Sequence, residues 1–168
     1  MAIFYVFQGE TYIEEYSGGY VWAPQRNSSG HKNIGYTMMT NIKKDDFILH
    51  NKKGNIVAIS IAQTDCYNAI QPKELLQANT TVNWQSEGYR VDTKYFEFDT
   101  PLNVKNYRDW LKDHYVKESA FNRFGKGKQQ YMCRLAKEHA DFLINNAIRL
   151  QKDTDLLLCL NKALSSIV

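Results

Sequence analysis

The sequence has no run that approaches the roughly twenty apolar residues needed to cross a bilayer. Its first residues also lack the basic region and the cleavage site of a secretory signal peptide. No charge of one sign dominates, since 21 Lys and Arg oppose 18 Asp and Glu, so the net charge of +3 does not by itself demand a polyanionic partner. We therefore expect a cytoplasmic protein without a membrane partner.

Cysteine is scarce and gives no sign of a metal or disulfide site. Cys66, Cys133 and Cys159 are an odd count, widely spaced and without a CxxC pair, which is typical of buried free thiols. The 4 histidines do not have zinc-ligand spacing, and the GxxxxGK[ST] and GxSxG motifs are missing. We expect neither a metal nor another cofactor.

The titratable residues give only weak support for catalysis. The acidic pairs Glu14-Glu15 and Asp45-Asp46 are interpreted as solvated turn charges, because adjacent residues of a strand point to opposite faces. His31 and His50 are possible acid–base groups, but neither has an evident partner in the sequence. We therefore expect a binding domain rather than an enzyme.

What the sequence does contain is a globular composition with a high aromatic share. Hydrophobic residues make up 43% and charged residues 23%, while aromatic residues reach 13%, with 11 tyrosines. A chain of 168 residues corresponds to one domain. We predict a binding domain over residues 1–152, followed by a C-terminal helix or linker over 153–168.

The hydrophobic periodicity changes from strands to helices near Pro101. Before it, we predict strands at 3–7, 20–22 and 89–98, an extended or turn segment at 11–16, a short helical run at 36–42, and a hairpin over 47–62. After it, we predict a helix capped by Asn103 and ending near 114, a basic glycine loop at 122–129, a long helix over 131–150, and a last helix over 155–167 capped by Asp153 or Thr154.

Aromatic, polar and basic residues near strand ends favour a site for a flat heteroaromatic ligand. Stacking on an aromatic ring is worth about 1–3 kcal/mol per base. Trp22 is either such a wall or a core residue, and packing statistics alone favour the core. The candidate walls are Trp22, Trp84, Tyr36 and Tyr89; the candidate base-edge readers are Asn27, Asn33, Ser60 and Asp92; the candidate phosphate contacts are Arg26, Lys32, Lys43, Lys44, Arg123, Lys126 and Lys128, each of which could equally be solvated surface.

Four short motifs also carry a family resemblance: YVFQG at residues 5–9, GYVWAP at 19–24, KKDDFILH at 43–50 and the apolar run at 56–62. Their order resembles the EVE-like and YTH-like branch of the PUA superfamily. More closely, it is similar to the N-terminal reader domains fused to McrB-type GTPases or HNH nucleases in modification-dependent restriction systems. The resemblance covers about residues 3–144 and implies an α+β fold, a small twisted mixed β-barrel with surrounding helices.

The resemblance also implies roles for particular residues. In that branch a base is flipped out of its strand and held in an aromatic cage. Trp22 then corresponds to one cage wall, Trp84 to the second, and the loop 122–129 to the basic loop that touches the nucleic-acid backbone. One departure matters: relatives often carry His-Trp where this chain has Tyr36-Thr37, and if that Trp lines the pocket, the ligand preference here differs.

The function implied is recognition of a methylated or hydroxymethylated base in double-stranded DNA, as the recognition module of a type IV, McrBC-like restriction system. Nuclease or GTPase activity would then belong to a fused or partner subunit. Two alternatives stay open. One is a reader of modified RNA, because 2′-hydroxyl contacts leave no sequence signature. The other is a small enzyme or a protein-interaction module that assembles through the leucine-rich tail at 156–168.

Overall fold

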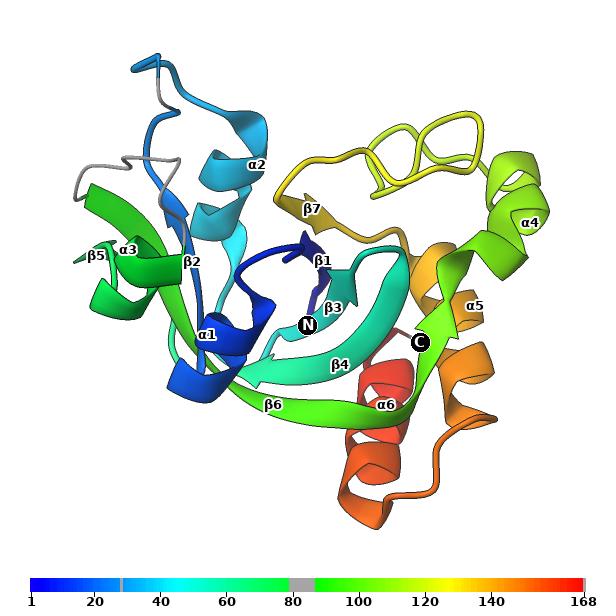
Figure 1. Cartoon of the computed structure of the whole chain (residues 1–168). Coiled ribbons are helices and arrows are strands. Elements are labelled where there is room, and N and C mark those ends of the chain that lie inside the picture. The colour runs from blue at the N-terminus through cyan, green and yellow to red at the C-terminus, as the bar shows by residue number, and fades with distance from the viewer. Residues whose placement is uncertain (28, 79–86, 168) are drawn as a thin grey trace.

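The computed structural model describes residues 1–27, 29–78 and 87–167, and the candidate wall Trp84 lies outside these ranges. One strongly curled mixed sheet forms the centre of the molecule, and helices surround it (Figure 1). Its strands are β1 (Ile3–Phe7), β2 (Tyr20–Pro24), β3 (Phe47–Lys52), β4 (Asn55–Ala62), β5 (Tyr67–Ile70), β6 (Glu87–Asn103) and β7 (Met132–Arg134). The expected α+β class and the twisted mixed β-barrel are confirmed.

The long strand β6 produces the curl of the sheet. The strand order is β2-β6-β4-β3-β1-β7, with β5 also paired to β6. The first part of β6 pairs with β2 and β5, whereas its later part pairs with β4, and a register shift interrupts the β4–β6 ladder between Ile56 and Ala58. Such irregularities bend a strand and increase its twist. β1 pairs with β3 in parallel, and the other strand pairs are antiparallel.

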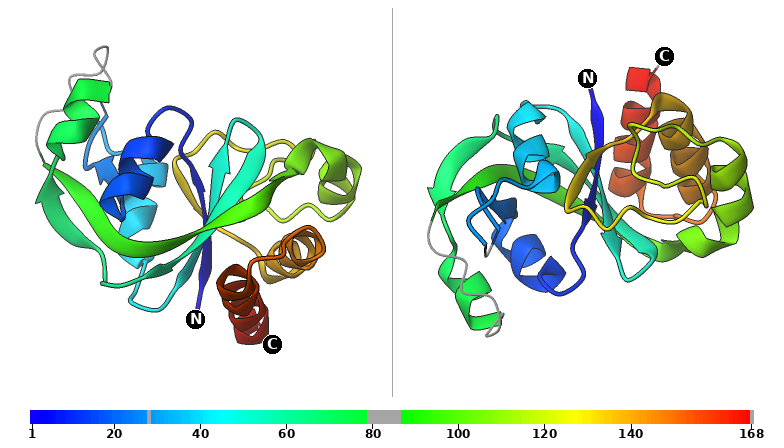
Figure 2. Two further views of the ribbon diagram at one scale, coloured as in Figure 1. Left: turned by 60° about the horizontal axis from the view of Figure 1, so that its bottom comes forward. Right: turned by 90° about the horizontal axis from the view of Figure 1, so that it is seen from above.

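The helices divide between two sides of this sheet. α1 (Tyr12–Gly18), α2 (Ile34–Thr37), the 3-10 turn η1 (Met38–Asn41) and α3 (Lys73–Ala78) lie on one side. The 3-10 turn η2 (Val104–Tyr107) and α4 (Arg108–Asp113) follow β6, while α5 (Lys137–Ile148) and α6 (Thr154–Ile167) pack side by side on the other side (Figure 2).

Strand β1 is buried on both faces because each face belongs to a different core. Ile3 and Tyr5 join the cluster under α5 and α6, while Phe4 and Val6 join the cluster inside the curl. Successive side chains of a strand point to opposite faces, so an uninterrupted apolar run is what this position requires. At its C-terminal end, β1 delivers Phe7, Gln8 and the following loop to the open end of the sheet.

Most predicted elements are found. Strand β1 and the hairpin of β3 and β4 are confirmed, and the helical run predicted at 36–42 lies at 34–41. The strand predicted at 20–22 continues through Pro24, so Trp22 lies in the middle of β2. Asn103 caps η2, since its Oδ1 accepts from the Lys105 N–H at 3.1 Å. Asp153 caps α6, since its Oδ1 accepts from the Leu156 N–H at 2.9 Å.

Two of the predicted elements are wrong. Residues 12–18 form helix α1 rather than the extended or turn segment predicted at 11–16, because Tyr12 and Glu15, one helical turn apart, are both buried on its inner face. The long helix predicted over 131–150 begins only at Lys137, since residues 132–134 pair as β7 with the edge of β1. No helix within the described ranges is long and apolar enough to cross a membrane.

Candidate nucleic-acid interface

A pocket of about 470 Å³ lies at the open end of the sheet, where β1 and β2 end. Four aromatic rings and one buried carboxyl group line it: Phe7, Trp22, Tyr36, Tyr131 and Glu15. Its volume falls within the range of roughly 300–1,000 Å³ that is typical of ligand pockets. We call this hollow the aromatic pocket.

Trp22 is both a core residue and a wall of the aromatic pocket. Only 2% of its surface is exposed, and it packs with Tyr20 and Leu75. Its indole Nε1 donates to the Ala69 carbonyl at 3.0 Å, which fixes the ring plane. Gly88 on β6 makes room for it, because a Cβ there would lie 2.3 Å from the indole Cζ2. Trp22 can therefore pack in the core and still line a pocket, so these two interpretations of the sequence do not exclude each other.

Tyr36 and Tyr131 supply two further rings of the aromatic pocket. Their centroids are 6.3 Å apart and their planes are inclined by 62°, an edge-to-face arrangement. Asn33 positions Tyr36, because its Oδ1 caps α2 by accepting from the Gly35 and Tyr36 N–H groups at 2.9 and 3.3 Å. Asn33 itself lines the pocket. Sequence reasoning missed Tyr131 because it placed this residue inside a helix.

Glu15 is the polar centre of the aromatic pocket, and it corrects the interpretation of Glu14-Glu15 as solvated charges. Its side chain is 1% exposed. Oε1 accepts from the Thr11 hydroxyl at 2.6 Å, while Oε2 accepts from Gln8 Nε2 at 2.9 Å and the Tyr131 hydroxyl at 2.7 Å. Burial raises the pKa of Glu15 to about 7, against the opposing effect of these donors.

A chain of buried hydrogen bonds continues from Glu15 into the sheet. Gln8 Nε2 donates to Glu15, so Gln8 Oε1 must accept from His50 Nδ1, 2.5 Å away. His50 Nε2 then accepts from the Ser60 hydroxyl at 2.6 Å. Burial lowers the pKa of His50 to about 3, which keeps the ring neutral. His50 therefore has two partners that the sequence did not reveal.

The candidate edge readers do not all meet at the pocket. Ser60 is fully buried on β4 and is bonded to His50. Asp92 forms an ion pair with Arg90 at 2.8 Å, and neither residue lines the aromatic pocket. Asn27 organises its own loop by accepting from the Ser29 and His31 N–H groups. Of the four candidates, the structure brings only Asn33 to the pocket.

The remaining candidates are also divided. Tyr89 packs against the core inside the curl rather than lining the aromatic pocket. Arg26 donates to the Gly30 carbonyl at 3.2 Å within an exposed loop, where Lys32 is also exposed. Lys43 and Lys44 lie beside the start of β3, the end of the sheet opposite the pocket. Lys126 and Lys128 line a neighbouring hollow, with the exposed Arg123 in the same loop.

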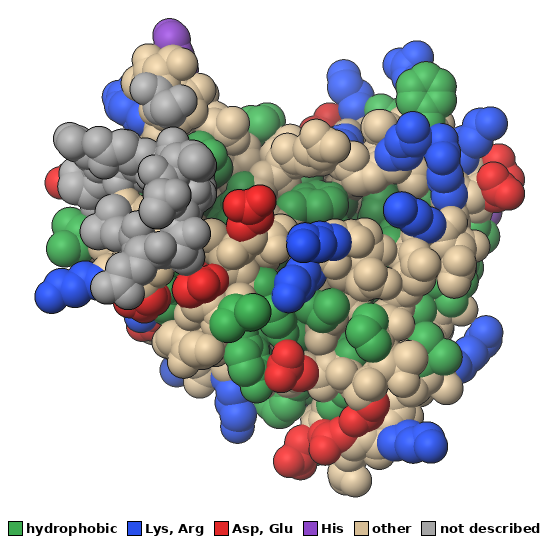
Figure 3. Space-filling view, in the orientation of Figure 1, with side chains coloured by type: hydrophobic (Ala, Val, Ile, Leu, Met, Phe, Trp, Pro, Cys, Tyr) green, Lys and Arg blue, Asp and Glu red, His purple; other side chains and the backbone are tan. Residues whose placement is uncertain are grey.

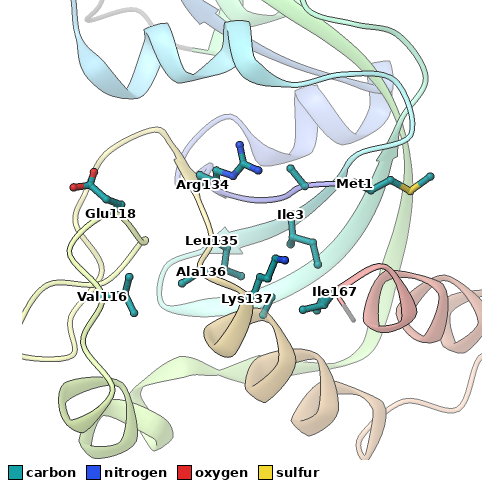
Figure 4. A pocket seen from close by; sticks show the side chains of 11 residues that line it. Met1, Ile3, Val116, Glu118, Arg134, Leu135, Ala136, Lys137 and Ile167 are labelled. Carbon is teal, nitrogen blue, oxygen red and sulfur yellow. The ribbon is translucent and has the colours of Figure 1, made fainter.

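A third hollow, of about 240 Å³, differs in its chemistry. It lies between the N-terminus, the start of α5 and the end of α6, and mainly aliphatic residues line it, including Ile3, Leu135 and Ile167 (Figure 4). No aromatic ring is among its lining residues, so it offers no stacking surface. Within the described ranges, no group of three or more His, Cys, Asp or Glu residues could hold a metal ion.

No known protein-family profile matches the sequence, and a comparison with curated proteins also finds no match. Solved structures do match the fold. Human THYN1 in complex with DNA containing 5-methylcytosine has a TM-score of 0.53 at 12% identity, covering 88% of this chain and 98% of that chain. The YTH domain of Zygosaccharomyces rouxii MRB1 in complex with N6-methyladenosine RNA has a TM-score of 0.52 at 4% identity, covering 87% and 86%.

A protein of Pseudomonas syringae, solved by X-ray crystallography, has a TM-score of 0.51 at 14% identity, covering 87% of this chain and 99% of that chain. At these identities the likeness shows the fold alone. The chain therefore has the same fold as THYN1 and the YTH domain.

Proposed function

We propose that this protein reads a modified base in double-stranded DNA by receiving the flipped base in the aromatic pocket. The observation that carries the proposal is the pocket itself, in which Trp22, Tyr36 and Tyr131 surround a space that ends at the buried Glu15 carboxyl. Rings supply stacking for any base, while Asn33 and the Thr11 hydroxyl, which is bonded to Glu15, supply polar atoms for its edge. Solved structures of the same fold contain methylated DNA or RNA, which supports this use of the fold.

The energetics decide what the pocket has to provide. Extruding a base costs a few kcal/mol of stacking and pairing. Stacking against one ring returns about 1–3 kcal/mol, so two or three rings offset the cost. One buried methyl group adds about 0.8 kcal/mol, which is only several-fold in affinity. Stronger selectivity requires that an unmodified base leave a buried polar group unpaired.

On the basis of the sequence resemblance, we propose that this reader serves a modification-dependent restriction system, with nuclease or GTPase activity in a fused or partner subunit. Binding rather than catalysis fits the pocket, because both Glu15 oxygens and both His50 ring nitrogens already take part in hydrogen bonds within the chain. A reader of modified RNA is the second candidate, since one solved structure of this fold is an RNA complex.

The test is a fluorescence-anisotropy titration of duplexes that carry 5-methylcytosine, 5-hydroxymethylcytosine, N6-methyladenine or no modification, with matched RNAs. We expect one modified duplex to bind more tightly than its plain counterpart. Tyr36→Ala removes a half-buried ring from the pocket and should weaken that binding by about 5- to 150-fold, the equivalent of 1–3 kcal/mol. Tyr115→Ala, which removes a ring that is 40% exposed elsewhere, is the matched control.

Equal affinity for every modified and plain duplex would contradict the proposal. So would a folded Tyr36→Ala variant that keeps the full preference for its modified duplex. Tighter binding of the modified RNA than of any DNA would select the second candidate instead.

A further inference from the structure

A hollow of about 960 Å³ lies beside the aromatic pocket, and five cationic residues line it. They come from three segments that are distant in the sequence. Lys53 belongs to the turn between β3 and β4, Lys105 and Arg108 belong to η2 and α4, and Lys126 and Lys128 belong to the loop 122–129. No Asp or Glu is among the described residues that line it. We call this hollow the basic groove.

The groove has a strongly positive face. Lys and Arg side chains gather on the upper right of the molecule, over α4 and the neighbouring loops (Figure 3). Four of these side chains are exposed, namely Lys53, Lys105, Arg108 and Lys126. Their charged groups lie at the surface, while their aliphatic parts line the groove. A concave surface lined by one sign of charge concentrates its field on a ligand of the opposite sign.

The loop 122–129 is held in place by its own hydrogen bonds and by two neighbours. Asn122 Oδ1 accepts from the Phe124 and Lys126 N–H groups at 2.9 and 3.0 Å. Arg108 Nε donates to the Phe124 carbonyl at 3.3 Å, which ties the loop to α4. Gly127 lies against Phe7 so closely that a Cβ there would be 2.8 Å from the ring. The loop is therefore ordered before any ligand binds, which lowers the entropic cost of binding.

The basic groove adjoins the aromatic pocket. Phe7, Gly9 and Gln129 line both hollows and form their common border. A nucleotide whose base enters the pocket leaves its sugar and phosphate at the pocket mouth. The next phosphates along the strand, on the side of the basic groove, then lie beside its cationic side chains.

We propose that the basic groove holds the phosphodiester backbone of the strand that supplies the flipped base, over the nucleotides on one side of it. The position of the backbone rests on the function proposed for the aromatic pocket, whereas the preference for a polyanion rests on the groove alone. Lys53, Lys105 and Arg108 are backbone contacts that the sequence did not indicate. These contacts position the strand and do not read its sequence.

The test is the double variant Lys105→Glu with Lys126→Glu, one residue from each of two walls, and both side chains are exposed. The matched control is Lys152→Glu with Lys162→Glu, which makes the same change of charge at exposed positions before and within α6. Anisotropy titrations use a modified and a plain duplex between about 50 and 200 mM salt. A thermal melt of each variant confirms that it is folded.

The groove variant should lose affinity for both duplexes by about fiftyfold or more at 0.1 M salt, because each released phosphate contact is worth roughly eightfold there. The slope of log K against log salt should become shallower by about 2. The ratio of modified to plain affinity should stay unchanged. The control should retain wild-type affinity to within about threefold.

Unchanged affinity and slope in a folded groove variant would overturn the backbone path, and so would an equal loss in the control. The same measurements distinguish a failure of the groove proposal from a failure of the proposed reader function. If the wild-type protein shows no preference for any modification but the groove variant still loses duplex binding, the reader function fails and the groove stands. If the preference exists and the groove variant binds normally, the groove fails and the reader function stands.

Discussion

The buried carboxyl of Glu15 should make the stability of this protein depend on pH in an unusual direction. Burial raises the pKa of Glu15 from an ordinary value of 4.5 to about 7. The folded state therefore holds the proton more tightly than the unfolded chain does. The contribution to stability is fully present below pH 4.5 and is lost as the pH rises through 7. The difference between the two pKa values corresponds to about 3 kcal/mol.

His50 acts in the opposite direction. Burial lowers its pKa from 6.5 to about 3, so the unfolded chain holds that proton more tightly. Its contribution is fully present above pH 6.5 and is lost as the pH falls toward 3. Between pH 4.5 and 6.5 the two residues therefore impose opposite slopes on the free energy of unfolding, and these slopes nearly cancel.

Glu15→Gln should remove the pH dependence of stability that Glu15 causes, while a side chain of similar size still fills its position. A glutamine can keep the same three partners, because its Oε1 accepts from Gln8 and Tyr131 while the Thr11 hydroxyl, which donates to Glu15, turns to accept from its Nε2. The stability of the variant relative to wild type should rise by about 3 kcal/mol between pH 4.5 and 8. Urea denaturation at five or six pH values measures this difference directly.

Glu138→Gln, at an exposed position on α5, controls for the loss of one carboxylate. Taking the difference from wild type cancels the titration of every other group, including His50. A difference for Glu15→Gln that stays constant from pH 4.5 to 8 would show that Glu15 does not titrate in this window, and the account of its burial would be refuted.

Two further predictions concern packing. Gly88→Ala should destabilise the fold by roughly 1–3 kcal/mol, because its Cβ would overlap the indole of Trp22 and lie 2.5 Å from the Ala23 carbonyl oxygen. A thermal melt checks this prediction. An unchanged melting temperature would contradict the packing of Trp22 against Gly88. Leu160→Ala should lower the free energy of unfolding by about 2–5 kcal/mol, because this side chain is fully buried in the core under α6. Leu158→Ala on the same helix should lower it by under about 0.5 kcal/mol, because Leu158 is 69% exposed. Equal losses of stability in urea denaturation would refute the burial of α6.

Local pattern was sufficient for much of the fold. The hairpin of β3 and β4, the strand β1 and the caps Asn103 and Asp153 were predictable because alternation, turn residues and capping side chains act within a few residues. The motifs around β1, β2 and the hairpin also led to the EVE-like and YTH-like fold, which the solved structures support.

The two wrong elements depended on distant partners. Residues 132–134 continue a helical stripe in the sequence, yet they form β7 because the edge of β1 offers them hydrogen bonds across more than a hundred residues of chain. Residues 12–18 contain aromatic and β-branched side chains that favour strands locally, and they form α1 because a helix buries Tyr12 and Glu15 together. Tertiary contacts outweigh such weak local preferences.

By itself, the sequence determined a globular composition with a high aromatic share, the strand that carries Trp22 and the cationic loop at 122–129, because these are properties of neighbouring residues. Only the tertiary structure decided that Tyr131 and Glu15 meet Trp22 in one pocket, and that Lys105 and Lys126 line one groove. The physical reason is that a pocket is formed where strands and loops from distant parts of the chain converge. Burial, which alone shifts the pKa of Glu15 so far, exists only after that convergence.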